Sequence, residues 1–116
     1  MYLQITTRCN MRCAHCCFAC RPGYGKDMSH EVFIAGLELA VKAGEWICIG
    51  GGEPTIHPHF WAFLRKAIEY NRKTDEPEHK VWLATNGRRK RDALRLARMT
   101  RDGEISAVLY QDQFHA

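Results

Sequence analysis

The sequence predicts an α/β fold in which four parallel strands alternate with three helices, in the order β-α-β-α-β-α-β. Two observations predict this class. Segments with the helical spacing of apolar residues alternate along the chain with short strand-like segments. These strand-like segments are nearly continuous apolar runs, which is typical of parallel strands covered on both faces. The 116 residues, 46% hydrophobic and 26% charged, have the composition of one ordinary globular domain.

The first strand is expected at residues 2–6, in the sequence YLQIT, directly before a cysteine-rich stretch. A proline and two glycines then predict a loop that ends at residue 28. Ser29 is a suitable N-cap for a helix that runs to about residue 43 and ends at Gly44. The apolar face of this helix is expected to contain Phe33, Leu37, Ala40 and Val41.

The next two strands and the helix between them repeat this pattern. Residues 46–49 form a strand that runs into three glycines, and residues 59–72 form a helix. The apolar face of that helix is expected to contain Phe60, Leu64, Ala67 and Ile68. Residues 80–87, KVWLATNG, form the third strand and end in Asn-Gly, the leading hairpin dipeptide. A helical pattern follows, so we expect a strand-to-helix turn there instead.

An arginine-rich helix is expected next, ending at Gly103, and a fourth strand is expected at residues 105–112. Seven of the 17 basic residues lie in residues 87–101, and the net charge is only +4. The helical period places Arg88, Arg91, Arg95 and Arg98 on one face and Ala93, Leu96 and Ala97 on the other. We interpret the arginine face as a solvated outer surface rather than an anion- or nucleic-acid-binding stripe, because no aromatic residues alternate with the arginines.

The N-terminal residues show no basic segment and no cleavage site of a secretion signal. No apolar run approaches the ~20 residues that a membrane span needs. We therefore expect a cytoplasmic protein with no membrane partner. In a reducing compartment, clustered cysteines bind metals or carry out redox chemistry more often than they form disulfides.

Five of the six cysteines lie in the stretch RCNMRCAHCCFACR, residues 8–21. Three of them follow the spacing C-x3-C-x2-C: Cys9, Cys13 and Cys16. This stretch is compatible with a disulfide framework, a zinc site, an iron–sulfur site or a thiol cluster without a ligand. Cys17 and Cys20 are expected to be ordinary loop thiols, although Cys20 is also a candidate fourth ligand. Cys48, in an isoleucine-rich strand, is expected to be a small core residue.

The unusual stretches all follow predicted strands. In a parallel sheet the carboxyl ends of the strands meet at one end of the sheet, which is where ligands bind. The segments at that end read TTRCNMRC, GGGEPT, TNGR and YQDQFH. Their convergence on one side of the molecule predicts a functional site there.

Two of these segments together resemble the signature of the radical S-adenosylmethionine (radical SAM) superfamily. CNMRCAHC has the spacing of its three-cysteine motif, and GGEPT matches its Gly-Gly-Glu motif after the second strand. The resemblance implies that residues 1–116 are the N-terminal half of a partial (β/α)6 barrel, so we expect the chain to be truncated. It also implies a [4Fe-4S] cluster held by Cys9, Cys13 and Cys16, with SAM on the open iron. Reductive cleavage of SAM would give a 5′-deoxyadenosyl radical that abstracts a hydrogen atom from an unknown substrate.

The same resemblance implies further contacts with SAM. Backbone groups of residues 51–53 would meet its methionine amino group, and Pro54 would stiffen the turn. His15 replaces the usual aromatic residue beside the adenine, where an imidazole can stack or bind metal. Asn86 either faces this site or simply forms the turn. The cofactor-binding residues expected on these grounds are His15, Gly51, Gly52, Glu53, Pro54, Asn86, Gln111 and Asp112, the last two near the SAM ribose.

Two alternatives to a SAM-cleaving enzyme remain: a zinc-binding or thiol-rich structural module, and an iron–sulfur electron-transfer module without catalysis. For an enzyme, the expected partners are the substrate and a reductant such as flavodoxin or ferredoxin. A sheet that ends at its fourth strand also leaves an unpaired edge, so association through that edge is expected if the chain is not truncated.

Overall fold

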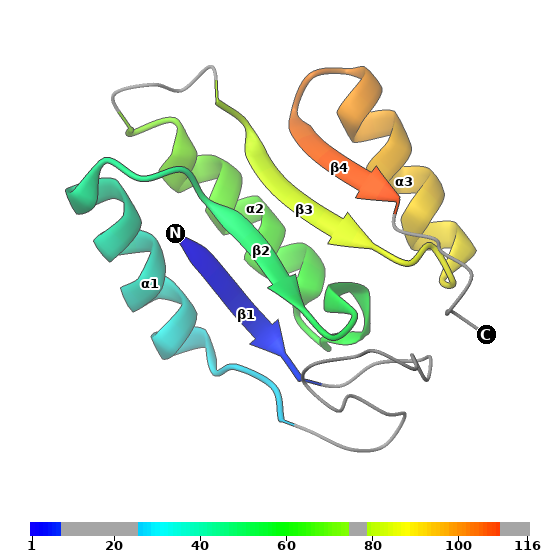
Figure 1. Ribbon diagram of the computed structural model, residues 1–116, viewed down its shortest axis with the longest axis horizontal. Coiled ribbons are helices and arrows are strands. Elements are labelled where there is room, and N and C mark those ends of the chain that lie inside the picture. Colours follow the sequence, from blue (N-terminus) through cyan, green and yellow to red (C-terminus); the bar gives the residue numbers. More distant parts are fainter. Residues whose placement is uncertain (8–25, 75–78, 110–116) are drawn as a thin grey trace.

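The computed structural model describes residues 1–7, 26–74 and 79–109. Strands and helices alternate along these residues (Figure 1). The strands are β1 (Tyr2–Thr6), β2 (Cys48–Gly51), β3 (Val81–Thr85) and β4 (Ile105–Leu109). The helices are α1 (His30–Ala43), α2 (Phe60–Asn71) and α3 (Lys90–Arg101), with a short 3-10 turn, η1 (Pro54–Ile56), between β2 and α2.

The four strands form one sheet in the order β1-β2-β3-β4, and every neighbouring pair is parallel. The register aligns Leu3 with Ile49, Ile49 with Leu83, and Leu83 with Ala107. These residues form one row across the sheet on the side that faces the core. The predicted α/β class with a parallel four-stranded sheet is confirmed.

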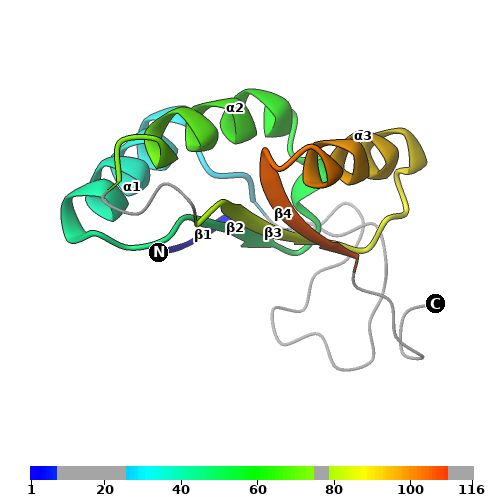
Figure 2. The ribbon, with the colours of Figure 1, turned by 90° about the horizontal axis from the view of Figure 1, so that it is seen from above.

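All three helices lie on the same face of the sheet, as the view from above shows (Figure 2). The core between the two layers is made of strand and helix side chains that are almost fully buried: Leu3, Ile5, Ile47, Ile49, Val81, Leu83 and Ile105 from the sheet side, and Phe33, Leu37, Ala40, Phe60, Phe63, Leu64, Ala67 and Leu96 from the helix side. On the opposite face, Tyr2 and Trp82 are 54% and 41% exposed. The apolar strands suggested a sheet covered on both faces, and among the described residues the helices cover one of them.

Helix α1 begins and ends as the sequence predicts. The Ser29 hydroxyl accepts a hydrogen bond from the Val32 amide at 3.3 Å, which caps the first turn. Gly44 has a left-handed conformation, with φ of 68°, and its amide donates to carbonyl groups of the last turn. Phe33, Leu37 and Ala40 are buried as expected.

Helix α2 has a wider buried face than the sequence predicts. Phe63 was not expected in it, yet its ring is buried and stacks on Phe33 of α1 with a centroid distance of 4.2 Å. Ile68 is only half-buried. The stack joins α1 to α2 over the sheet.

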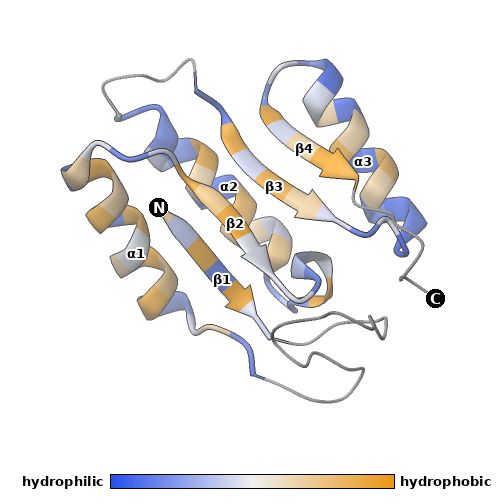
Figure 3. Ribbon diagram, in the orientation of Figure 1, coloured by the Kyte–Doolittle hydropathy of each residue, from blue (hydrophilic) through white to orange (hydrophobic). Residues whose placement is uncertain are grey.

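Helix α3 differs from the expected arrangement at its start and along its buried face. It begins at Lys90, so Arg88 precedes the helix, and Ala97 is exposed while Leu96 is buried. Asp92 anchors the first turn, because it accepts from the indole N–H of Trp61 at 3.1 Å and from Arg89 Nε at 2.8 Å. Figure 3 shows hydrophilic segments on α3, whereas β2 to β4 are largely hydrophobic.

Strand β2 starts two residues later than expected and extends further into the glycines. Trp46 is 58% exposed and stacks on His79 instead of pairing in the sheet. Gly50 and Gly51 belong to the strand because they align with Gln4 and Thr6 of β1. The shift places the Gly-Gly-Glu segment directly at the carboxyl end of the sheet.

Candidate functional site

The carboxyl ends of β1, β2 and β3 come together at one end of the sheet, here called the carboxyl end of the sheet. Hydrogen bonds join Thr6, the turn formed by residues 51–53 (the glycine turn) and the start of the β3–α3 turn. The convergence expected from the sequence is thus observed for these three segments. Eight residues singled out in the cysteine-rich and C-terminal segments lie outside the described residues: Cys9, Cys13, His15, Cys16, Cys17, Cys20, Gln111 and Asp112.

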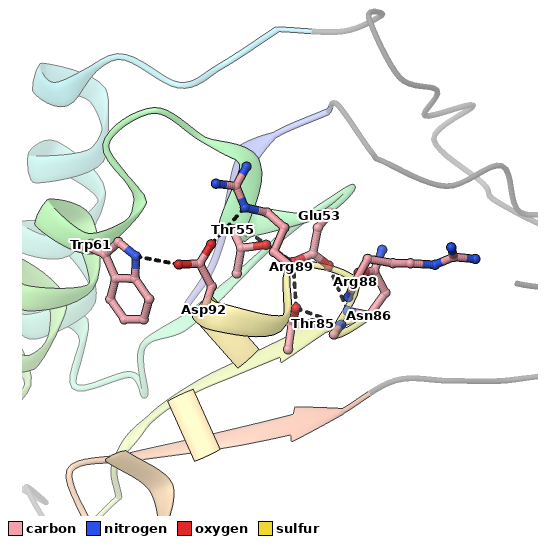
Figure 4. Close-up of polar contacts among 9 residues, drawn as sticks. Glu53, Thr55, Trp61, Thr85, Asn86, Arg88, Arg89 and Asp92 are labelled. Carbon is pink, nitrogen blue, oxygen red and sulfur yellow. Dashed lines mark hydrogen bonds and ion pairs between the residues drawn. The ribbon is translucent and has the colours of Figure 1, made fainter. Parts of the chain in front are cut away.

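The carboxylate of Glu53 is the polar centre of this end of the sheet. Its side chain is 1% exposed. Oε2 accepts from the amide and hydroxyl of Thr55 and from the Thr85 hydroxyl at 2.6 Å, and Oε1 accepts from the Asn86 amide at 2.8 Å (Figure 4). Burial is tolerable because both oxygens are hydrogen-bonded. Glu53 therefore fastens the glycine turn and η1 to the end of β3.

Asn86 forms part of the β3–α3 turn, which is one of the two roles expected for it. Its Oδ1 accepts from the Arg88 amide at 3.0 Å, and Gly87 has a φ of 73°. Thr85 Oγ1 also accepts from the Gly87 amide at 3.2 Å. The side chain of Asn86 thus shapes a strand-to-helix turn while its amide binds Glu53.

The glycines of the turn make room for β1. A Cβ atom on Gly51 would lie 2.3 Å from the Thr6 carbonyl oxygen, and one on Gly50 would lie 2.0 Å from the Tyr2 hydroxyl oxygen. The Gly51 amide donates to that hydroxyl at 3.1 Å, and the Gly52 amide donates to the Thr6 carbonyl at 2.9 Å. At positions 50 and 51 the space left by the missing side chains is therefore filled by this chain. Pro54 is buried as the first residue of η1.

The residues on either side of segment 8–25 are paired with each other. Thr6 and Asp27 form an antiparallel bridge, and the Thr6 hydroxyl donates to the Asp27 carboxylate at 2.7 Å. The Thr7 amide donates to the Lys26 carbonyl at 2.9 Å, and the Met28 amide donates to the Ile5 carbonyl at 2.7 Å. The cysteine segment thus begins and returns at the same point, next to the glycine turn.

His57 completes the connections at this end of the sheet, although no sequence pattern marks it as a site residue. Its ring is 5% exposed and packs on Phe63 with a centroid distance of 4.5 Å. Nε2 lies 2.9 Å from the Met28 carbonyl oxygen, and Nδ1 accepts from the His59 amide at 3.0 Å. Thr85 was missed too. Its position as the last residue of a parallel strand is the signal that would have pointed to it.

Within the described residues, no group of three or more His, Cys, Asp or Glu side chains is arranged to hold a metal ion. Cys48 is a free, half-buried thiol on the open face of the sheet, in the row of Tyr2 and Trp82, so the expectation of a core position is wrong. Burial raises the pKa of its thiol.

Among the residues that the structure describes, no helix is long and apolar enough to cross a membrane.

A parallel α/β sheet with connected polar turns at the carboxyl end of its strands is consistent with part of a (β/α) barrel, in which ligands bind at that end. The sequence profile of the Radical SAM superfamily matches residues 3–106. The chain belongs to this superfamily, whose members are enzymes that generally use a [4Fe-4S] cluster and SAM. In such a partial barrel the helices lie outside, which explains why only one face of the sheet carries them.

One curated relative is a tungsten-containing aldehyde ferredoxin oxidoreductase cofactor-modifying protein from Pyrococcus furiosus. It is 41% identical to this chain over 69 residues. The matched part covers 57% of this chain and 19% of the relative, so the chain spans about a fifth of the relative's length.

Proposed function

We propose that this chain is the cluster- and SAM-binding half of a radical SAM enzyme. Cys9, Cys13 and Cys16 would hold three irons of a [4Fe-4S] cluster and leave the fourth iron to SAM. When bound and reduced by an external electron donor, the cluster would supply the electron that cleaves SAM to methionine and a 5′-deoxyadenosyl radical. The observation that carries the proposal is the hydrogen bond between the Gly52 amide and the Thr6 carbonyl, because it joins the Gly-Gly-Glu turn to the strand that ends three residues before Cys9.

The length of the chain supports this arrangement. Cys9 is three residues beyond Thr6, and three extended residues span at most about 11 Å. Chain length alone therefore keeps Cys9 within about 11 Å of Thr6, the residue that binds the Gly52 amide. Thr7 and Lys26, the described residues nearest to the cysteine segment on either side, are hydrogen-bonded to each other.

The glycine turn has a group that suits the methionine amino end of SAM. An ammonium group needs hydrogen-bond acceptors. Within the described residues, no hydrogen bond uses the carbonyl oxygen of Gly52. The Glu53 carboxylate already accepts from Thr55, Thr85 and Asn86, so its part is to hold the turn in place. We therefore assign the SAM contact to the backbone of residues 51–53 and a positioning role to the Glu53 side chain.

The remaining contacts and partners follow from family membership. We propose His15 beside the adenine and Gln111 or Asp112 at the ribose, in a cytoplasmic enzyme reduced by a flavodoxin or a ferredoxin. Because the relative's name describes modification of a cofactor, an organic cofactor is the substrate class to test first. We also propose that this chain is one half of the core domain, and that β4 is where the sheet continues.

The test is anaerobic reconstitution with iron and sulfide, followed by reduction with dithionite in the presence of SAM. We expect about four irons per chain and formation of 5′-deoxyadenosine. Cys13→Ala should abolish both, while Cys48→Ala, in a strand away from the motif, should change neither. Bound zinc in place of iron would favour a structural module. A cluster without SAM cleavage in the full-length protein would favour an electron-transfer module.

A further inference from the structure

His57 joins two segments that the proposed chemistry needs at a fixed separation. It is the C-cap of η1, and η1 begins directly after Glu53, the last residue of the glycine turn. Its Nε2 contacts the carbonyl oxygen of Met28, where the chain returns from the cysteine segment. Met28 is in turn bonded to β1 through the Ile5 carbonyl.

The hydrogen bonds fix the tautomer of the ring. Nδ1 accepts from the His59 amide, so it carries a lone pair and no proton. The proton of the neutral imidazole is therefore on Nε2, which donates it to the Met28 carbonyl at 2.9 Å. Each ring nitrogen has one backbone partner, and the ring face packs on Phe63. The side chain is thus held in one orientation.

The glycine turn and the histidine that follows it therefore contact the chain on both sides of the cysteine segment, at Thr6 and at Met28. The Gly52 amide binds the Thr6 carbonyl where that segment begins, and His57 binds the Met28 carbonyl where it returns. The bonds of Gly52 and Glu53 fix the turn relative to β1 and β3. The bond of His57 adds a contact to Met28, and so sets where the returning chain lies relative to the turn.

We propose that His57 is a positioning residue that sets the orientation of the glycine turn relative to the cluster-binding segment, and thereby the affinity for SAM. This inference rests on the proposed function, since SAM must contact both segments at once. A buried histidine that only fills space would contribute to folding but would not change SAM affinity in folded, cluster-containing protein.

Two substitutions separate the two bonds of the ring. His57→Gln keeps an N–H near the position of Nε2 and can still donate to the Met28 carbonyl. His57→Asn keeps an acceptor near the position of Nδ1 for the His59 amide but is too short to reach Met28. Both variants remove the contact between the His57 ring and Phe63, so the loss of this ring contact is common to them. His59→Gln, at an exposed neighbouring ring, is the control.

The measurement is SAM binding to the reconstituted full-length protein by calorimetry, with iron content determined for each sample. In addition, the electron paramagnetic resonance spectrum of the reduced cluster is recorded with and without SAM. We expect His57→Asn to weaken SAM binding about tenfold or more with iron content unchanged, the effect of leaving the partly buried Met28 carbonyl unpaired. His57→Gln should remain within about threefold of the unmodified protein, and its spectrum should still change on addition of SAM.

Loss of iron from His57→Asn, with iron and SAM affinity kept in His57→Gln, also supports the positioning role. Equal SAM affinity in the two variants, or loss of iron from both, overturns it while leaving the proposed function in place. An unmodified protein that assembles no cluster or binds no SAM overturns the proposed function, and this inference falls with it.

Discussion

The two ends of the sheet are stabilised by different kinds of interaction. At the carboxyl end, the buried Glu53 carboxylate and the His57 ring bind partners at 2.6 to 3.3 Å. At the amino end, the starts of β2, β3 and β4 surround a mainly apolar cavity of about 420 Å³. Its wall includes the stacked pair Trp46 and His79, whose centroids are 4.0 Å apart, and Cys48. Directional bonds fix positions, whereas apolar contacts tolerate small shifts.

This difference explains where function is expected within one fold. Both ends belong to the same four strands, so strand pairing does not distinguish them. Among the described residues, the turns that follow the strands, at the carboxyl end, are fastened to one another by hydrogen bonds of side chains such as Glu53 and Thr85. Substitutions at that end should therefore alter both stability and the geometry of the site. Substitutions at the amino end should alter stability alone.

The largest effect is expected for Glu53→Ala. The change leaves the Thr85 hydroxyl and the Asn86 and Thr55 amides without their buried acceptor. We expect a loss of about 3 to 5 kcal/mol in the free energy of unfolding, measured by urea denaturation. Glu53→Gln keeps the shape but turns one acceptor into a donor, and should cost about 1 to 3 kcal/mol.

The control for this pair is Glu38→Gln on the exposed side of α1, which should change stability by about 0.5 kcal/mol or less. A loss below about 1 kcal/mol for Glu53→Ala would mean that the carboxylate acts only as an ordinary helix cap. It would also remove the argument that Glu53 fastens the glycine turn to β3.

An intermediate effect is expected when alanine replaces glycine in two places. Gly51 has a φ of 151°, and an added Cβ would lie 2.3 Å from a backbone oxygen of β1. Gly103 has a φ of 79°, but no atom lies within 4 Å of the added Cβ. Gly51→Ala should cost about 2 to 4 kcal/mol, from strain plus overpacking, and Gly103→Ala about 1 to 2 kcal/mol from strain alone. Equal losses in parallel urea titrations would show that β1 moves away freely, and that the turn is not held by Thr6.

The parts of the structure that the sequence predicted are those set by neighbouring residues. Ser29 and Gly44 fix the ends of α1 through bonds within one helical turn, so the sequence shows them directly. The alternation of strands and helices, and the meeting of the turns at one end, also follow from local patterns and the parallel topology. Family motifs then pointed to the glycine turn and to the cysteines.

The parts that the sequence did not predict depend on contacts between distant residues. The family motif points to the backbone of Glu53, but the partners of its carboxylate, Thr85 and Asn86, lie more than 30 positions away. The partner of His57 is a backbone carbonyl, which no sequence pattern marks. Trp46 has a strand-forming side chain but stacks on His79, so packing rather than propensity set the start of β2.

The smallest effect is expected at the amino end, from the titration of Cys48. Burial raises the pKa of its thiol above the ordinary value of 9.0, so the folded state keeps the proton to higher pH than the unfolded state does. The stability from this group is fully present below the unfolded pKa and is lost as pH rises through the folded pKa. Above about pH 9 the unfolded chain binds fewer protons, and the free energy of unfolding should fall with pH.

Cys48→Ala removes this dependence while the other cysteines remain. The measurement is urea denaturation of both proteins, reduced and free of metal, from about pH 8 to pH 10.5. We expect the stability difference between them to be constant at the lower pH values and to shift in favour of Cys48→Ala at the higher ones. A difference that stays constant over the whole range would show that the Cys48 thiol is as well solvated in the folded protein as in the unfolded chain. The amino end of the sheet would then be open to water at β2.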